Sequence, residues 1–444
     1  MKKSLFTCCF FFLIVVLHAQ NWQPMAIGVL PDDYVVFSIS AAGDNVVWAV
    51  ASQEYYQAPI PGTHQSHYLR SSDGGQSWST GAIEETAGTI SFQIVAVDSL
   101  TAWITTQDYG SGPGRALYQT TDGGVTWVKK HSASAVGVAL NRFSDGQHWL
   151  AHNRQLLSKS DDNGTVWTNS TFTGYQANEF QLLNSGANMS CTVGDTLWSG
   201  TSAGRILRMT NYGQSQEFIT TTLGTGTEIN SIAFQDHLNG LCWSRNVLGN
   251  NRIARSMDGG ATWSVLAQQP GSATGWNVAA VPGAPGFYVL ASNYNYNQGK
   301  VAVTTNQGNS WSVENLNQSL NSVVFTSPTT GWIGVGKTTS ATQPSTQPHL
   351  YKYVGAPLVS VRTPVALAGL SVAPNPASSH IRFAFEGSDS AQSVMVTITD
   401  AAGQVVFSSP TSERQLDIST LPAGAFFLKI ESHGKTGVAA FVKQ

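Results

Sequence analysis

The sequence predicts an all-β protein, a seven-bladed β-propeller followed by a small immunoglobulin-like β-sandwich. An eight-residue motif returns along the chain at steps of 49, 40, 49, 47 and 48 residues. Short strand-like segments with an aromatic residue recur between its copies, and near residue 354 this pattern gives way to a different one. A period of this size indicates one supersecondary unit per repeat. Four short strands per unit is the size of a propeller blade.

Composition supports strands and turns over helices. Of the 444 residues, aromatics make up 10% and charged residues 11%, and glycine occurs 43 times. β-branched and aromatic residues punctuated by glycine are typical of strands, and such a composition is not that of a disordered chain. The net charge is −3 and no basic block follows the N-terminal segment. We therefore expect neither nucleic acid nor an anionic membrane surface as a partner.

The first 20 residues are expected to be a signal peptide. Lys2 and Lys3 precede a short apolar run, residues 10–17, and a cleavage zone near Gln20. That run is too short to span a membrane comfortably. After cleavage only Cys191 and Cys242 remain. Export permits a disulfide between them, and two small buried thiols fit equally well.

The recurring motif has the form Ser/Thr-x-Asp-x-Gly-x-Ser/Thr-Trp and predicts a β-hairpin. Its Asp can accept hydrogen bonds from the following amides, its Gly allows a turn geometry that is costly for other residues, and its Trp can anchor the emerging strand. A worn copy at Asn211–Ser215 lacks the Trp. The residues with these structural roles are Asp73, Gly75, Trp78, Asp122, Gly124, Trp127, Asp162, Gly164, Trp167, Asp258, Gly260, Trp263, Asn306, Gly308 and Trp311.

The strand-like segments between the motifs set the number of blades at seven. They are residues 46–49, 102–104, 148–150, 197–198, 241–243, 287–289 and 331–333. The last unit ends near Tyr353 without a motif, while Asn21–Met25 supplies a strand and Trp22 with no blade before it. We therefore expect the N-terminal strand to complete blade seven and close residues 21–354 into a ring, which removes two exposed sheet edges. Six or eight blades are the alternatives, because the fourth unit is degenerate.

The motif resembles the Asp-box, or BNR, repeat of sialidases, photosystem II assembly-factor propellers and many secreted propellers. That resemblance implies that each box joins the two outer strands of a blade and lies away from the binding face. It assigns the Asp residues to structure and not to catalysis.

Residues 355–369 read as a linker, and residues 370–444 alternate strands with Gly or Asn turns. This tail holds a Pro-Asn-Pro opening at residues 374–376, an Asp-x-x-Gly turn at residues 400–403 and Leu-Pro-x-Gly at residues 421–424. It resembles the type A C-terminal sorting domain of the type IX secretion system of Bacteroidota, although Phe426 stands where that family usually has Tyr. The resemblance implies contact with the secretion machinery, removal of the domain, and release or attachment at the outer-membrane surface. A generic carbohydrate-binding sandwich is the alternative.

The sequence carries no motif for a metal, a cofactor or a nucleophile. It lacks His-Glu-x-x-His, Cys-x-x-Cys and a phosphate-binding Gly-rich loop followed by Lys. His64 and His67 are too few for zinc, and residues 161–164 lack the spacing of a calcium loop. We therefore predict no catalytic residue, no metal and no cofactor.

A glycosidase would need two carboxyl groups facing each other across a cleft. The carboxylates outside the boxes include Asp32, Asp33, Glu54, Glu84, Glu85, Asp108, Glu179, Glu228 and Asp236, and the sequence does not pair them. The chain has no Arg-Ile-Pro segment and its arginines are scattered, which disfavours a sialidase.

Long loops that mix Tyr with Asn and Gln are the candidate binding sites. Tyr55, Tyr56, Tyr109, Tyr294 and Tyr296 suit a glycan or a protein ligand through stacking and hydrogen bonds, and ordinary solvated loops are the alternative. The favoured function is a non-catalytic binding or scaffold module, secreted or attached to the surface. The alternatives are a glycan-active enzyme, glycoside hydrolase-like, with carboxylates on a propeller face, and an assembly chaperone for a protein client.

Overall fold

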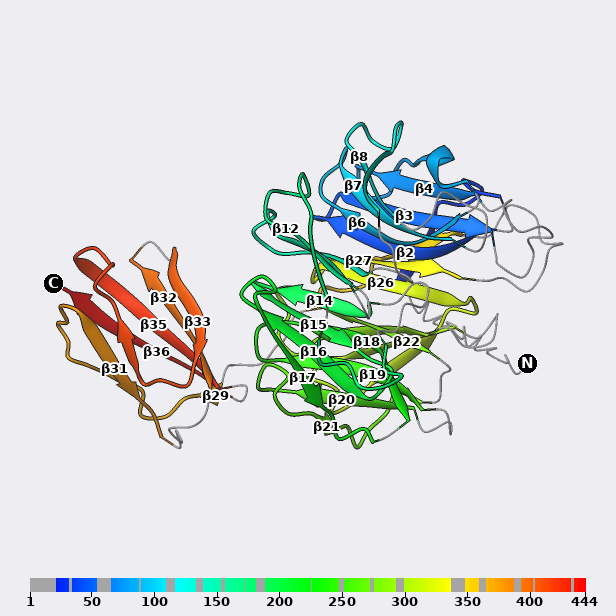
Figure 1. Cartoon of the computed structure of the whole chain (residues 1–444). Coiled ribbons are helices and arrows are strands. Elements are labelled where there is room, and N and C mark those ends of the chain that lie inside the picture. The colour runs from blue at the N-terminus through cyan, green and yellow to red at the C-terminus, as the bar shows by residue number, and fades with distance from the viewer. Residues whose placement is uncertain are drawn as a thin grey trace, which may run out of the picture.

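Seven four-stranded antiparallel sheets, each a blade, make up the first part of the chain (Figure 1). The computed structural model describes residues 21–444 apart from 32–33, 54–64, 88, 109–115, 133–138, 153–155, 172, 181–187, 225, 247–250, 272–274, 293–298, 337–347, 359–364, 387–392, 402–403 and 433–434. Within these ranges the single helical element is a short 3₁₀ turn, η1(Glu84–Thr86). The predicted all-β class is confirmed.

The strands of each blade follow one another outwards from the axis of the ring. Blade one has β2(Tyr34–Ala42), β3(Val46–Gln53), β4(Ser66–Ser71) and β5(Ser79–Ala82); blade two has β6(Thr89–Ala96), β7(Ala102–Asp108), β8(Ala116–Thr120) and β9(Val128–Ser132); blade three has β10(Ala139–Arg142), β11(Trp149–His152), β12(Leu156–Ser160) and β13(Thr168–Thr171). Blade four has β14(Ser190–Val193), β15(Thr196–Gly200), β16(Arg205–Thr210) and β17(Ser215–Thr220); blade five has β18(Thr227–Phe234), β19(Gly240–Asn246), β20(Arg252–Ser256) and β21(Ser264–Val265). Blade six has β22(Trp276–Ala280), β23(Tyr288–Ser292), β24(Lys300–Thr304) and β25(Ser312–Asn315); blade seven has β26(Leu320–Ser327), β27(Thr330–Val335), β28(Leu350–Tyr353) and β1(Trp22–Met25). The seven aromatic segments of the sequence fall on or beside the second strands.

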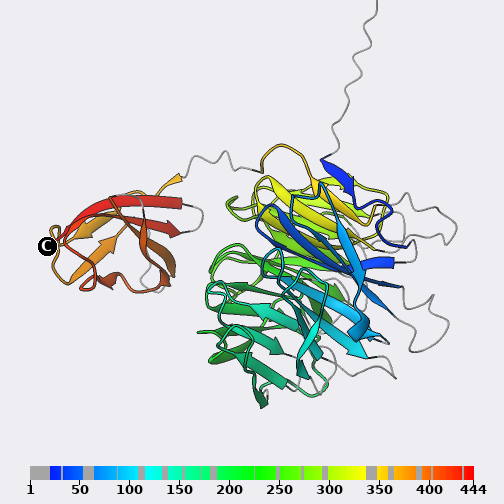
Figure 2. The ribbon, with the colours of Figure 1, turned by 90° about the horizontal axis from the view of Figure 1, so that it is seen from above.

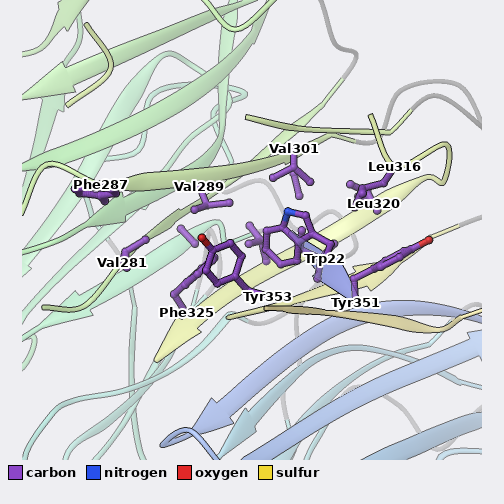
Figure 3. Close-up of a cluster of buried hydrophobic side chains, with 14 of the residues drawn as sticks. Trp22, Val281, Phe287, Val289, Val301, Leu316, Leu320, Phe325, Tyr351 and Tyr353 are labelled. Atoms are coloured by element: carbon purple, nitrogen blue, oxygen red, sulfur yellow. The ribbon is translucent and has the colours of Figure 1, made fainter. Parts of the chain in front are cut away.

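The N-terminal strand closes the ring, as the sequence predicts. Strand β1 pairs antiparallel with β28, so that Trp22 lies opposite Tyr353. The Trp22 side chain is 1% exposed and packs edge-on against Phe325 and Tyr353, with ring centroids 6.0 and 5.3 Å away (Figure 3). A buried Trp contributes strongly to stability because it removes a large apolar area from water. The count of seven blades is confirmed.

The first strands of successive blades lie side by side around the axis, and hydrogen bonds join each to the next. Going round the ring, they run from Ala96 N to Ser40 Oγ, Leu140 N to Gln93 Oε1, Ser190 Oγ to Asn141 Oδ1, Ile232 N to the Asn188 carbonyl, Val278 N to Ser231 Oγ, Asn277 Nδ2 to the Asn321 carbonyl and Asn321 Nδ2 to the Val36 carbonyl. Except for the side-chain bond between Ser190 and Asn141, these bonds satisfy backbone groups that the inner edges of the sheets would otherwise leave unpaired.

The C-terminal part is a β-sandwich, as expected. One sheet has the order β29(Val365–Ala366), β36(Lys435–Lys443), β35(Gly424–Ser432), β32(Val394–Asp400) and β33(Val405–Thr411), and the other β30(Ser371–Ala373), β31(His380–Ala384) and β34(Gln415–Asp417). Its own core includes Ile381, Val396, Leu428 and Phe441. Figures 1 and 2 show this sandwich as a body separate from the propeller.

Candidate functional site

The Asp of each box lies at the centre of a small hydrogen-bond network that holds its hairpin. In the first box, Ser71 Oγ donates to Asp73 Oδ1 (2.8 Å) and accepts from Gly75 N (2.8 Å). The amide and hydroxyl of Ser77 donate to the same carboxylate, at 3.0 and 2.5 Å. Trp78 Nε1 donates to the Gly75 carbonyl at 3.2 Å. The hydrogen bonds expected from the motif are therefore present.

These bonds also lower the pKa of the carboxylates in the first two boxes. Hydrogen bonds from the hydroxyl and amide of Thr126 lower the pKa of Asp122 to about 2, and the corresponding donors at Ser77 hold the pKa of Asp73 lower still. A carboxylate stabilised in this way stays ionised at neutral pH and is a poor proton donor or acceptor.

Each box also ties its blade into the ring. In blade one the Gly74 amide donates to the Asn45 carbonyl of the turn between the first two strands, at 2.9 Å. The Gly74 carbonyl accepts from Lys352 Nζ of blade seven at 2.6 Å. Gly75 has φ of +91°, and a Cβ there would lie 2.7 Å from Trp332 Cη2 of blade seven. Only glycine satisfies both the turn and this close approach.

Basic side chains repeat this link between blades, which sequence reasoning missed. Arg70 Nη1 donates to the Gly123 carbonyl of the next blade, Arg208 Nη1 to that of Gly259 and Arg255 Nη1 to that of Gln307, at 3.2, 2.7 and 3.3 Å. The available signal was Arg70 and Arg255, each directly before the first residue of a box. Cations that donate to a backbone carbonyl in this way serve the fold and are not a cluster aimed at a substrate.

The worn fourth box keeps its hairpin but changes the contact with its neighbour. Asn211 and Tyr212 have φ values of +50° and +54°, and β16 pairs with β17 across the turn. The Tyr212 ring stacks on His148 of blade three with centroids 4.0 Å apart. His148 Nδ1 lies 2.5 Å from Asp145 Oδ2. A stacked His–Tyr pair therefore stands where four other blade junctions have a basic side chain on a box carbonyl.

A cavity of about 430 Å³ lies on the axis, among the innermost strands. It reaches residues of all seven blades, including Ser38, Ile94, Asn188 and Phe325. Of the described residues that line it, none is an Asp, Glu, Lys, Arg or His. The size is within the range of small-molecule sites, which are typically apolar with a few convergent polar groups.

The described carboxylates that the sequence analysis considered do not meet at this cavity. Glu179 is buried, and Arg205 Nε and Thr201 Oγ1 donate to its Oε1 at 3.0 and 2.6 Å. Burial raises the pKa of Glu179, but the hydrogen bonds from Arg205, the Gln176 amide and Thr201 outweigh it and leave that pKa below its ordinary value. Asp236 accepts from two amides of its own turn.

The remaining carboxylates fall in three groups. Glu84 and Glu85 form the 3₁₀ turn η1, and Glu228 lies opposite Arg245 on β18 and β19. Asp32, Asp33 and Glu54 lie outside the described residues, as does the side chain of Asp108.

Tyr55, Tyr56, Tyr109, Tyr294 and Tyr296 also lie outside the described residues. Their loops connect the second and third strands of blades one, two and six. The boxes connect third and fourth strands. Because successive connections in an antiparallel sheet leave from opposite edges, the tyrosine loops attach at the edge of the ring opposite the boxes.

Histidine and cysteine form no further site in the part of the chain that the structure describes. No group of three or more His, Cys, Asp or Glu side chains there is placed to hold a metal ion. His64 is outside the described residues, while the His67 ring lies edge-on to Tyr34 at 4.7 Å. Cys191 and Cys242 are free thiols, and burial raises their pKa values. Within the same ranges, no helix is long and apolar enough to cross a membrane.

The Pro-Asn-Pro and Asp-x-x-Gly motifs of the tail form hydrogen bonds that stabilise its sandwich. Asn375 Nδ2 donates to the Ala440 carbonyl at 3.1 Å and its Oδ1 accepts from Val442 N at 2.9 Å, which docks the Pro-Asn-Pro segment on β36. Asp400 Oδ1 accepts from Gln404 N at 2.9 Å and closes the turn before β33.

The family model described as secretion system C-terminal sorting domain matches residues 371–444. These residues are a type IX sorting domain. A sorting domain marks a chain that is exported and is either secreted or attached to the cell surface.

Solved structures similar to this chain include propellers. YCF48 bound to D1 peptide is 15% identical, with 77% of this chain and 97% of that chain covered and a TM-score of 0.52, which shows the fold. YCF48 from Cyanidioschyzon merolae is 15% identical, with coverages of 76% and 99% and a TM-score of 0.49. The GH74 enzyme of Niastella koreensis is 10% identical, with coverages of 92% and 84% and a TM-score of 0.40. No curated protein sequence matches the chain.

Proposed function

We propose that this exported propeller is a non-catalytic binding or scaffold module. The observation that carries the proposal is the charge-free lining of the axial cavity among the described residues. Hydrolysis of a glycosidic bond normally needs one carboxyl group as acid and a second as base or nucleophile, set several ångströms apart. An uncharged cavity is suited to holding a ligand and offers no such pair.

Other acidic residues already accept hydrogen bonds from within the protein, which supports the same function. The box carboxylates accept hydrogen bonds within their own turns, as Asp73 and Asp122 do. The Glu179 carboxylate accepts a hydrogen bond from Arg205 Nε. Because a catalytic carboxylate must be free to exchange protons with a substrate, these residues are better explained by stability.

Assays of glycan hydrolysis test this proposal against the alternative of a glycan-active enzyme. Purified protein incubated with a panel of polysaccharides is expected to release no reducing ends. Release that Glu54→Gln or Asp108→Asn abolishes would overturn the proposal, because those residues adjoin the tyrosine loops. Glu217→Gln is the matched control, since Glu217 pairs on the surface with Arg208 at 2.6 Å.

The tyrosine loops remain part of the proposal as a second contact surface. Tyr55, Tyr109 and Tyr294 belong to three different blades, and their loops attach at one edge of the ring. Tyrosine provides both an apolar face and a hydroxyl, which suits a glycan or a protein ligand. The sorting domain is the part of the chain that contacts the secretion machinery.

A further inference from the structure

We propose that the axial cavity is a one-ended pocket that opens on the box edge of the ring and binds a neutral saccharide unit. The inference rests on the proposed binding function, and it adds a ligand class and a face. That face is opposite the edge where the tyrosine loops attach, and it differs from the expectation, drawn from the Asp-box resemblance, that the boxes lie away from the binding face.

Side chains close the pocket partway along the axis. Asn188, just before the inner strand of blade four, donates through Nδ2 to the Val278 carbonyl (2.8 Å) and the Val323 carbonyl (2.9 Å). These acceptors belong to the inner strands of blades six and seven, so the side chain bridges strands across the ring. From blades one and two, Phe37 packs edge-on against Phe92 at 5.4 Å, within a cluster that includes Val35 and Ile90.

The open end faces the boxes. On five of the inner strands the lining residues belong to the second half of the strand, as with Ser38–Ser40 of β2, Ile232–Phe234 of β18 and Val323–Phe325 of β26. These halves lead into the turns between first and second strands. The boxes bond to those same turns, as Gly74 does to the Asn45 carbonyl. The pocket therefore opens at the edge of the ring that carries the boxes.

The groups left over for a ligand are neutral and few. Ser38 Oγ accepts from Ile94 N and Ser40 Oγ accepts from Ala96 N, at 3.3 and 2.9 Å, so each hydroxyl proton can still be donated. Both N–H donors of the Asn188 side chain are used in its bonds to Val278 and Val323, whereas its Oδ1 can accept a hydrogen bond from a ligand. Most of the other lining side chains are apolar, and the polar exceptions are Gln93, Thr105, Thr106, Ser190, Thr192 and Gln235. A saccharide brings hydroxyls that donate and accept together with apolar ring faces, whereas a charged ligand would lose its hydration with no counter-charge among the described lining residues.

A peptide is a poorer fit for the same space. Extended peptides usually bind a sheet edge by adding a strand, which needs free backbone groups on that edge. Here the inner-edge amides of Ala96, Leu140 and Val278 already donate to side chains of a neighbouring blade. Side-chain hydroxyl and amide groups remain, and these favour a ligand rich in hydroxyls.

Titration calorimetry on the purified protein with cellobiose, maltose, lactose and N,N′-diacetylchitobiose tests the inference, with galacturonic acid as the charged comparison. We expect at least one neutral sugar to bind and galacturonic acid not to bind. The double variant Ser38→Ala, Ser40→Ala should weaken that binding about tenfold or more, because it removes two hydroxyl donors. Ser79→Ala is the control, since Ser79 is an exposed serine on the outer strand β5. Melting temperatures of all variants are measured alongside.

The outcomes separate this inference from the proposed function. Equal affinity of the wild type and the double variant, with both folded, would place the sugar elsewhere and overturn the pocket while leaving a binding module. No binding by any of the neutral sugars would overturn the ligand class. Should the double variant fail to fold, Ser38→Thr and Ser40→Thr replace it: each keeps the hydroxyl and adds a methyl group at the pocket, and unchanged affinity would again overturn the inference. Release of monosaccharide in the same samples would instead overturn the non-catalytic function.

Discussion

At the scale of single residues, the sixth box separates the shape of the Asp from its charge. Asn306 Oδ1 accepts from Thr304 Oγ1 and from Ser310 N, at 3.0 and 2.9 Å, just as an Asp oxygen does in the other boxes. Its Nδ2 donates to Ser310 Oγ at 2.8 Å, which reverses the direction of the last bond. The turn therefore needs a planar side chain with two polar heads more than it needs a negative charge.

We therefore expect Asp122→Asn to melt close to the wild type at neutral pH and Asp122→Ala to melt lower, because alanine leaves the Thr120 and Thr126 donors without partners. The pKa of Asp122 is about 2 when folded, below the ordinary value of 3.8. A lowered folded pKa gives stability that is present above pH 4 and is lost as the pH falls through 2. Thermal melts across this range should show a smaller loss for Asp122→Asn. Equal melting of the two variants at neutral pH would contradict this account.

At the scale of elements, a strand from the N-terminus forms the fourth strand of blade seven. Strand β1 brings Trp22 into a core shared with blades six and seven, beside Val301, Leu316 and Phe325 (Figure 3). Without it, β28 would be an exposed edge and this cluster would open to water. Unlike the box tryptophans, Trp22 reaches its place without a preceding hairpin.

Trp22→Ala is expected to lower the free energy of unfolding by about 3–5 kcal/mol, the usual cost of removing a buried Trp from a core. Trp311→Ala is the matched control, because that box Trp is only partly buried and should cost less. Urea unfolding followed by circular dichroism measures both. If the two substitutions cost the same, ring closure by Trp22 is not a special contribution to stability.

At the scale of the whole molecule, the two bodies have separate cores. The sandwich buries Ile381, Leu428 and Phe441 among its own strands, and the propeller closes on itself through β1. Export and binding can therefore be assigned to different parts of the chain and tested separately.

Deletion of residues 371–444 should hold the protein in the periplasm while its propeller stays folded. Immunoblots of cell fractions measure the location, and the melting temperature of the purified truncated protein measures folding. Phe426→Tyr, which introduces the residue usual in the family, should be exported like the wild type. Unchanged export of the truncated protein would contradict the role of the sorting domain.

The sequence by itself determined the parts of this protein that depend on neighbouring residues. The spacing of the boxes and the aromatic strands indicated seven blades, the unpaired Trp22 strand indicated how the ring closes, and the motifs of the tail indicated a sorting domain. Each of these features is encoded in a short segment or in a fixed period of the sequence, so it can be recognised without knowing which distant residues meet in the fold.

Only the tertiary structure decided what lies between the blades. The links from Arg70 and Lys352 to box carbonyls, the burial of Glu179 against Arg205, and the bridge made by Asn188 join residues that are 26 to 278 positions apart. The neutral axial pocket is assembled mainly from the inner strands of all seven blades, and no single repeat encodes it. Which side chains converge there depends on the closure of the ring, because closure brings the seven inner strands together around one axis.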